Sequence, residues 1–326
     1  MNSRTRFLET MRYGHPDRVP YFQEGIRKEV IREWNKQGLD FAAELTDKFP
    51  IDGREEVEID GYPHPRFIHW PTSISGLNSL RRRLKPNESR LPEGWRKKIS
   101  IWSARQDVLM LEVHHGFFLS LGVDNWRRFY QVIESLTDRP DYVLEIMRIE
   151  AEMVARLTEQ FLSKVQIDAA IFSEPIGGNN GSLISPRMYE KFVLSTYMPV
   201  LEVLKRHGVD IIILRTYANA RVLIPSMLKF GINCLWACET NAIAMDYRSI
   251  RGEFGRNLRL IGGIDLDVLR EGKQAIQREI EEKVPPLLEQ GGYVPLADGR
   301  VRVDIPFENY LYYRQLLEEF THPQGY

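Results

Sequence analysis

From residue 168 onward, the chain repeats one pattern: a short apolar run, rich in β-branched residues, precedes a longer stretch with apolar residues at helical spacing. Such alternation is typical of βα units around a parallel sheet, so the pattern predicts an α/β fold. The runs predicted as strands are residues 168–173, 210–214, 232–237, 258–262 and 292–296. The helices predicted between them span residues 185–207, 220–230, 245–254 and 273–290.

The N-terminal half is less regular. Between residues 55 and 113, short alternating runs separated by Pro, Gly and Asn predict a meander inserted near the first strand. No internal repeat or flexible linker divides the sequence, so residues 1–326 are expected to form one domain. The other elements predicted in this half are a strand at residues 18–23, a helix at residues 27–37 that ends at Gly38, and helices at residues 124–136 and 138–162.

Eight parallel strands with helices between them close into a (β/α)8 TIM barrel, whose active site lies at the C-terminal ends of the strands. At those ends the sequence places carboxylates, arginines and other polar side chains. Each of them alone fits an ordinary turn, but together they favour a catalytic site. The residues are Gln23, Glu24, Glu174, Arg215, Thr216, Tyr217, Cys238, Glu239, Asp265, Asp298 and Arg300.

Composition gives no indication of several classes of partner. The 44 Lys and Arg residues balance 45 Asp and Glu residues, which gives no reason to expect nucleic acid or an anionic membrane as partner. No apolar run is long enough to span a membrane, and the N-terminal stretch lacks the apolar core of a signal peptide. Two cysteines are too few for a disulfide framework, so a cytoplasmic protein is expected.

Glu174 follows a buried-looking strand and precedes the glycine-rich segment 176–181. A carboxyl group in such a position can be a general acid whose pKa is raised by burial. Equally, it can accept hydrogen bonds from neighbouring backbone amides. The glycine-rich segment matches neither nucleotide-binding fingerprint, so we interpret it as a flexible active-site loop in which Asn180 positions the substrate.

Two other pairs of residues have reactive side chains. Cys234 and Cys238 can ligate a metal, but a strand filled by two small buried cysteines is the favoured interpretation, and Glu239 is the better functional candidate. His114 and His115 are adjacent on a predicted strand and are therefore expected to point to opposite faces, so at most one enters the cavity.

Three arginines lie near predicted strand ends: Arg27, Arg215 and Arg300. A guanidinium group in an apolar cavity needs a partner, because burying an unpaired charge is costly. Either the protein's own carboxylates or an anionic substrate can supply that partner. The sequence leaves both alternatives open.

Long stretches of the chain resemble the uroporphyrinogen decarboxylase superfamily. They include HPDRVPYFQEGIRKEVIREWNKQGLD, FSEPIGGNNGSLISPRMYEKFVLSTYMPVLEVLKRHGVD and the tail that begins LRLIGGIDLDVL. The run GGID…GK.AI…GGY.P..D…P.ENY.YY is most similar to the branch of corrinoid-dependent methyltransferases and O-demethylases. The resemblance implies a (β/α)8 barrel, in agreement with the periodicity.

The sequence departs from that family's patterns at three places. The arginine-rich segment RQAGRYLP, which holds the propionates of a porphyrinogen, corresponds here to FQEGIRKEV, which keeps Arg27 but has Glu24. The family's His-x-Cys zinc motif is replaced by residues 215–219, RTYAN, and its late Asp-His pair by Asp298 followed by Gly299. The departures argue against a porphyrinogen substrate and against bound zinc.

The resemblance therefore implies a methyltransferase that moves a methyl group between a small methylated substrate and a corrinoid (cobalamin) carried by a partner protein. Glu174 or Glu239 would protonate the leaving atom. The alternatives are decarboxylation of a polycarboxylated substrate, with Asp298 or Glu174 handling the proton, and a non-catalytic barrel that binds a small molecule. The residues predicted to bind substrate are Glu24, Arg27, His114, Asn180, Arg215, Tyr217, Asn219 and Arg300.

Overall fold

The computed structural model describes residues 1–36, 49–240 and 243–322. The chain groups into two compact units. The first unit comprises Met1–Arg54, Gln106–Val108 and Cys234–Tyr326, and the second unit comprises Glu55–Arg105 and Leu109–Asn233. Both contain parallel strands joined by helices, which confirms the α/β class. Closure into an eight-stranded barrel and the single domain stay predictions.

Two runs of the second unit, residues 108–113 and 169–172, are apolar and buried apart from Glu112, as expected for strands covered on both faces, whereas residues 54–58, REEVE, are not. Neighbouring strands follow the order β1-β2-β3-β6, and the pairs β2–β3 and β3–β6 are parallel. The strands are β1 (Arg54–Glu58), β2 (Val108–His114), β3 (Ala169–Glu174) and β6 (Ile212–Tyr217), with a two-stranded ribbon of β4 (Gly177–Gly178) and β5 (Gly181–Ser182).

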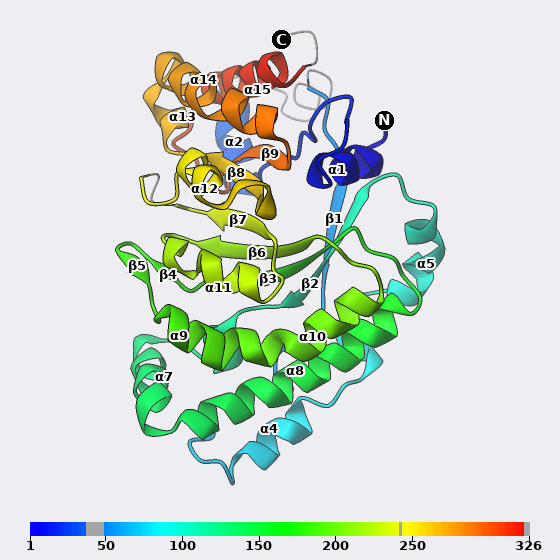
Figure 1. Ribbon diagram of the computed structural model, residues 1–326, viewed down its shortest axis with the longest axis vertical. Helices are drawn as coiled ribbons and strands as arrows, with labels where there is room; N and C mark the ends of the chain where they lie inside the picture. Colours follow the sequence, from blue (N-terminus) through cyan, green and yellow to red (C-terminus); the bar gives the residue numbers. More distant parts are fainter. Residues whose placement is uncertain (37–48, 241–242, 323–326) are drawn as a thin grey trace. The chain divides into compact units, whose positions relative to one another are not determined.

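Helices α8 and α10 of the second unit pack side by side along the strands (Figure 1). Helix α8 begins with Pro140, a favoured residue at a first helical position, and buries an apolar stripe that includes Ile146 and Val154. The helical segments of this unit are α4 (Leu77–Arg83), η1 (Glu88–Arg90), α5 (Trp95–Ser103), α6 (Phe117–Ser120), α7 (Trp126–Asp138), α8 (Pro140–Leu162), α9 (Pro186–Tyr189), the π-helical η2 (Glu190–Leu194), α10 (Ser195–Arg206), η3 (Arg221–Leu223) and α11 (Ile224–Lys229).

The first unit contains the parallel strands β7 (Cys234–Cys238), β8 (Arg259–Ile264) and β9 (Tyr293–Ala297), in that order. Its C-terminal helices α14 and α15 pack against each other (Figure 1). The helical segments of this unit are α1 (Ser3–Met11), α2 (Lys28–Lys36), α12 (Tyr247–Phe254), η4 (Gly255–Asn257), α13 (Val268–Glu271), α14 (Lys273–Gln290) and α15 (Phe307–Thr321).

All five strands predicted from residue 168 onward are confirmed, as are the helices between them. The first predicted strand, residues 18–23, is wrong: the segment forms only isolated contacts, such as Tyr21 O with Asp52 N–H at 3.0 Å. Pro20 has no N–H to donate to a ladder, and the nearby bridge between Ile26 and Val301 is a single pair. Gly38, the predicted end of the next helix, lies outside the described residues.

The predicted meander between residues 55 and 113 is largely wrong. Strand β1 confirms its first run, but the run at residues 97–104, KKISIWSA, belongs to helix α5. Trp95 and Trp102 are both buried there, seven residues apart, which is a helical and not a strand spacing. In this segment the helical spacing of the buried tryptophans, and not the alternation of polar and apolar residues, corresponds to the structure that forms.

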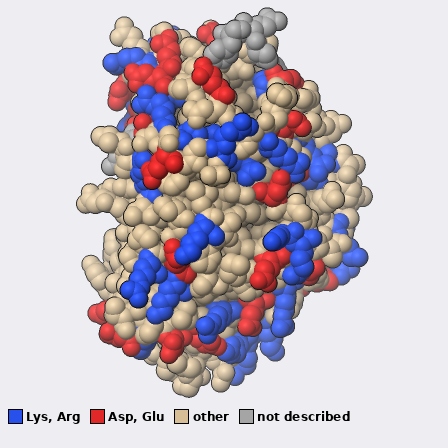
Figure 2. Space-filling model, viewed as in Figure 1, with Lys and Arg blue, Asp and Glu red and all other residues tan. Residues whose placement is uncertain are grey.

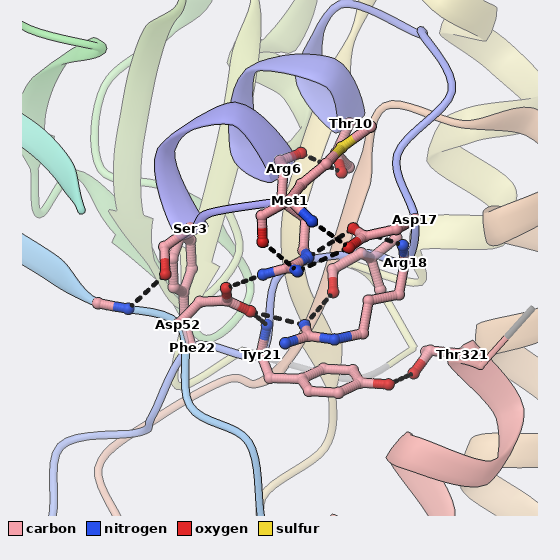
Figure 3. A network of polar contacts seen from close by, with 12 residues as sticks. Met1, Ser3, Arg6, Thr10, Asp17, Arg18, Tyr21, Phe22, Asp52 and Thr321 are labelled. Carbon is pink, nitrogen blue, oxygen red and sulfur yellow. Dashed lines mark hydrogen bonds and ion pairs between the residues drawn. The ribbon is translucent and has the colours of Figure 1, made fainter. Parts of the chain in front are cut away.

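An ionic network holds the N-terminal segment of the first unit together (Figure 3). Arg18 Nη1 donates to Asp52 Oδ2 at 2.6 Å, and Arg6 binds both Asp52 and Asp17. The hydrogen bond from Arg6 is the main reason why the pKa of Asp17 is lowered. These carboxylates are therefore ionised partners of arginines, and they fix α1 against the segment that leads into β1.

Acidic and basic side chains are interspersed on the face of the molecule shown in Figure 2, in keeping with the nearly zero net charge. Within the described part of the chain, no helix combines the length and the apolar character that crossing a membrane requires.

Candidate functional site

A charged group lies on one face of the strands of the second unit. Arg215 on β6 donates through Nη1 to Glu56 Oε2 on β1 at 2.6 Å, and through Nη2 to Glu112 Oε2 on β2. In the register of β3 and β6, Arg215 lies beside Ser173, which shares its face of the sheet. We call Glu56, Glu112 and Arg215 the charged triad. Arg215, predicted to bind substrate, thus has two carboxylate partners from the protein itself.

Glu112 has the acid–base character of a proton donor. Burial raises its pKa to about 7, with Arg215 opposing the rise and Glu58 and Glu56 adding to it. Its side chain is still 17% exposed. A catalytic acid is most effective when its pKa lies near the working pH. Glu112 can therefore hold a proton at neutral pH and deliver it to a bound molecule.

Glu174, the predicted general acid, lies at the end of β3 and is fully buried. Its Oε1 accepts a hydrogen bond from Phe117 N–H at 2.9 Å, and its Oε2 accepts one from the Tyr197 hydroxyl at 2.5 Å. Burial raises the pKa of Glu174 to about 7, although both donors oppose the rise. The contact with Phe117 N–H is of the backbone kind that the sequence analysis gave as the alternative to an acid role. The acid role of Glu174 stays a prediction.

His114 and His115 both approach Glu150, a buried residue of helix α8. Glu150 Oε1 lies 3.4 Å from His115 Nδ1 and 3.7 Å from His114 Nε2. The prediction that the histidines point to opposite faces is therefore wrong: β2 ends at His114, so the alternation of a strand does not extend to His115.

At neutral pH the carboxyl group of Glu150 is protonated and both imidazole rings are uncharged. Burial raises the pKa of Glu150 to about 8 and lowers that of His115 to about 4. Burial also lowers the pKa of His114 well below its ordinary value. Gly116 N–H donates to His114 Nδ1 at 3.0 Å, so the neutral His114 ring carries its proton on Nε2.

The glycine-rich loop after β3 forms the hairpin of β4 and β5, with the exposed Asn180 in its turn. Asn219 N–H donates to Gly178 O at 3.1 Å, which ties the hairpin to the segment after β6. A Cβ on Gly177 would lie 2.0 Å from Tyr217 O, so only glycine permits this approach. The structure therefore brings the hairpin that carries Asn180 close to the backbone of Tyr217 and Asn219, and the substrate-positioning role of the three residues stays a prediction.

Glu24, in the first unit, is buried and fully engaged by the protein. Its Oε1 accepts hydrogen bonds from Tyr313 at 2.5 Å and from Ala297 N–H at 3.2 Å. Its Oε2 accepts one from Tyr310 at 2.7 Å and lies 3.7 Å from Arg314 Nη1. These contacts join the segment before α2 to β9 and α15, and they leave Glu24 suited to holding the fold.

Glu239 follows β7 and Asp298 follows β9 in the first unit, and β8 lies between these two strands. Asp298 is 4% exposed and accepts hydrogen bonds from Thr240 N–H at 2.7 Å, the Thr240 hydroxyl at 2.7 Å and Leu266 N–H at 3.1 Å. Burial raises the pKa of Asp298, and its donors oppose that rise. Glu239 is exposed, in a left-handed conformation with φ of 46°, and its N–H donates to Asp298 O at 2.6 Å. Glu239 is thus the more accessible of the two carboxylates.

Arg27 and Arg300 come from neighbouring segments of the first unit, which the bridge between Ile26 and Val301 joins. The Arg27 side chain is 58% exposed, and its Nη1 lies 3.9 Å from Glu29 Oε1. Arg300 is exposed, and its stem packs on Gly25, where a Cβ would lie 3.2 Å from Arg300 Cγ. Both guanidinium groups are accessible to an anion.

The residues at the expected zinc position do not fit a zinc ion. Arg215 belongs to the charged triad, and Thr216 is buried. Cys234 is fully buried at the start of β7, and burial raises the pKa of its thiol to about 12. Across residues 1–36, 49–240 and 243–322, no three His, Cys, Asp or Glu side chains are arranged to hold a metal ion.

Sequence reasoning missed Glu56, Glu112, Glu150 and Tyr197. Glu112 interrupts the apolar run VLMLEV of β2, and Glu150 interrupts the apolar face of α8. A carboxylate within an otherwise buried element is a signal that can be recognised in the sequence, because such a residue is costly to bury without a role. No local signal marks Tyr197, whose apolar ring fits any helix core.

Sequence comparison finds relatives of this chain among known proteins. Residues 124–318 match the profile of the family described as Uroporphyrinogen decarboxylase (URO-D). The chain is also similar to a protein from Legionella pneumophila (strain Paris) named "Uroporphyrinogen decarboxylase", with 24% identity over 187 residues. The match covers 56% of this chain and 49% of that relative, so it spans about half of the relative's length.

Proposed function

The chain belongs to the uroporphyrinogen decarboxylase family, and from that premise we propose that it is a methyltransferase. It moves a methyl group from a small methylated substrate to a corrinoid carried by a partner protein. The observation that carries this proposal is the charged triad, in which a carboxyl group with a pKa near 7 lies beside an arginine already bound by two carboxylates.

The charge of the triad argues against a polycarboxylated substrate at this face. With Glu112 protonated, as the acid role requires, Glu56 and Arg215 balance each other, and Glu58 adds a further acidic group nearby. An approaching carboxylate would meet repulsion and would have to compete for Arg215. A neutral methyl donor, such as a methyl ether or a methylated amine in its free-base form, meets no such barrier.

Glu112 supplies the proton that methyl transfer requires. A cobalt(I) corrinoid supplies the nucleophile when the partner protein is bound. As the methyl–oxygen or methyl–nitrogen bond breaks, its electron pair stays on the leaving atom, which takes the proton from Glu112. Arg215 then stabilises the Glu112 carboxylate that remains. In this proposal Tyr217, at the end of β6 and two residues beyond Arg215, orients the substrate beside the triad.

The test compares Glu112→Gln with Glu55→Gln. Glu55 is a carboxylate on β1 that binds Lys98 and Trp102 outside the triad, and its replacement controls for a lost charge. Free cob(I)alamin with a panel of methyl aryl ethers and methylamines gives an absorbance change when methylation occurs. We expect Glu112→Gln to slow turnover about 100- to 10,000-fold, with little change in KM. Full turnover in this variant would refute the acid role of Glu112.

A second candidate function rests on the accessible Arg27 and Arg300 of the first unit. Guanidinium groups bind carboxylates well, so this pair favours decarboxylation of a polycarboxylated substrate, the reaction type in the name of the Legionella relative. Release of CO2 from such a substrate, lost in Arg300→Gln and retained in Glu112→Gln, would establish this function in place of methyl transfer.

A further inference from the structure

Glu174 joins three elements of the second unit through its two oxygens. Oε1 binds the N–H of Phe117, the first residue of α6, and Oε2 binds the Tyr197 hydroxyl of α10, while Glu174 itself ends β3. Tyr197 also lies 3.1 Å from His114 Nδ1, with the two rings 4.3 Å apart. We call Glu174, Tyr197 and His114 the helix-side network, because α10 covers it. All three side chains are buried.

The helix-side network holds the turn that follows β2. Gly116 N–H donates to His114 Nδ1 at 3.0 Å, and the next amide, Phe117 N–H, donates to Glu174. Gly116 has φ of 108°, and a Cβ there would lie 2.6 Å from Pro175 Cδ and 2.8 Å from Ser173 O. The turn is therefore pressed against the end of β3, and two successive amides fasten it there.

The register of β2 shifts just before this turn. Glu112 pairs with Ile171, whereas His114 pairs with Phe172, so two steps along β2 match one step along β3. Such a bulge changes the face to which the following residue points. In a regular strand, residues two apart share a face. Here Glu112 points to Arg215, and His114 points to Tyr197 on the opposite side.

We propose that Glu174, Tyr197 and His114 are positioning residues that hold the β2 bulge and so keep Glu112 directed at Arg215. The proposal rests on the proposed function only in the role it gives to Glu112. Without the network, the turn is free to relax toward a regular strand, in which Glu112 and His114 would compete for one face. Glu174 thus acts through the backbone and not by giving its own proton to a substrate.

The test uses a matched pair of tyrosines. Tyr197→Phe removes the hydroxyl that binds Glu174, and Tyr189→Phe removes a hydroxyl that is equally buried in the same unit but has no hydrogen-bond partner among the described residues. The titration of Glu112 is followed by 13C NMR of protein labelled at glutamate carboxyl carbons, with Glu112→Gln assigning the signal. Hydrogen exchange of the Gly116 and Phe117 amides reports the turn.

We expect Tyr197→Phe to shift the titration midpoint of Glu112 by roughly one pH unit, because the distance between Glu112 and Arg215 changes. The two turn amides should exchange about tenfold faster. Tyr189→Phe should leave both unchanged. An unchanged Glu112 midpoint in Tyr197→Phe, or an equal shift in Tyr189→Phe, would overturn the proposal.

Glu174→Gln provides a second variant if Tyr197→Phe does not fold, with the same expected shift and the same overturning result. Because NMR and exchange need no substrate, they decide the positioning role separately from the reaction. A wild-type protein that transfers no methyl group would refute the proposed function and leave these measurements valid.

Discussion

Buried carboxylates occur in both units, but their surroundings differ in kind. In the first unit, Asp52 is 3% exposed and binds Arg6, Arg18 and the N–H of Tyr21 (Figure 3). Burial opposes ionisation there, but the backbone and arginine donors outweigh it and lower the pKa of Asp52. In the second unit, Glu150 and Glu174 are as deeply buried, yet burial raises their pKa values to about 8 and about 7.

The pKa values of these carboxyl groups differ because of their neighbours and not because of how deeply they are buried. Among the described side chains, no lysine or arginine forms an ion pair with Glu150 or Glu174, whose neighbours are hydroxyl groups, backbone amides and neutral histidines. A carboxylate beside cations stays ionised and holds elements together, whereas one without cations keeps a proton near neutral pH. Glu112 lies between these extremes, since it has both burial and Arg215.

The largest expected effect is on the charged network of the first unit. Asp52→Ala leaves the buried side chain of Arg6 and the partly exposed side chain of Arg18 without their shared carboxylate. We expect a loss of about 3–5 kcal/mol in the free energy of unfolding, measured by urea denaturation at pH 7. A loss below about 1 kcal/mol, the usual range for exposed pairs, would show that the network is not a structural anchor.

The second prediction concerns the loss of stability that Glu150 causes as the pH rises. The folded-state pKa of Glu150, about 8, lies above the ordinary value of 4.5, so the folded protein holds a proton that the unfolded chain releases. The contribution of Glu150 to the free energy of unfolding is therefore full below about pH 4.5 and is lost as the pH rises to about 8, by roughly 2–4 kcal/mol. Glu150→Gln should remove most of this fall in urea titrations between pH 5 and 8. An identical pH slope in the two proteins would contradict the assignment.

The third prediction is smaller and tests the neutral network directly. Glu174→Gln keeps one oxygen acceptor but turns an NH2 group toward the second donor, Phe117 N–H or Tyr197. We expect a loss of about 1–2 kcal/mol at pH 6, where the wild-type carboxyl is mostly protonated. The same urea measurement on Asp52→Ala serves as the reference, and equal losses in the two variants would erase the distinction between the networks.

The smallest effect is expected at Asp17. Its pKa is lowered, chiefly by the hydrogen bond from Arg6, but its side chain is 41% exposed, so water screens the interaction. Asp17→Asn should therefore cost only about 0.5–1 kcal/mol at pH 7. The wild-type contribution is present above the ordinary aspartate pKa and disappears as the pH falls through the lowered value. Thermal unfolding in low and high salt checks this, because the difference between the two proteins should shrink in high salt.

Local patterns predicted most of the regular structure. The strands β3, β6, β7, β8 and β9 and the helices between them follow from apolar runs and helical spacing, which act within ten to twenty residues. The errors fall where two local patterns competed, as in α5, or where pairing depended on distant segments, as at residues 18–23. In that segment Pro20 has no N–H to donate to a neighbouring strand, and the nearby pairing of Ile26 with Val301 is a single bridge.

The predicted site shows the same division. The sequence nominated Arg215, Tyr217, Asn180 and Asn219, and the structure brings the last three together at one hairpin. The sequence did not identify the partners of Arg215, because Glu56 and Glu112 lie 159 and 103 residues away along the chain. It singled out Glu174 from its place after a strand, but the contacts that define its role come from α6 and α10.

The sequence by itself thus determined the order of strands and helices from residue 168 onward, the absence of the expected zinc motif and the residue types near the strand ends. Only the tertiary structure decided which carboxylates meet arginines and which meet tyrosines and histidines. The physical reason is that helical and strand periodicity are short-range properties of the chain, whereas a pKa depends on burial and on charges brought close by folding. The β2 bulge also depends on tertiary structure, because it is a shift in the pairing of β2 with β3, more than fifty residues away along the chain.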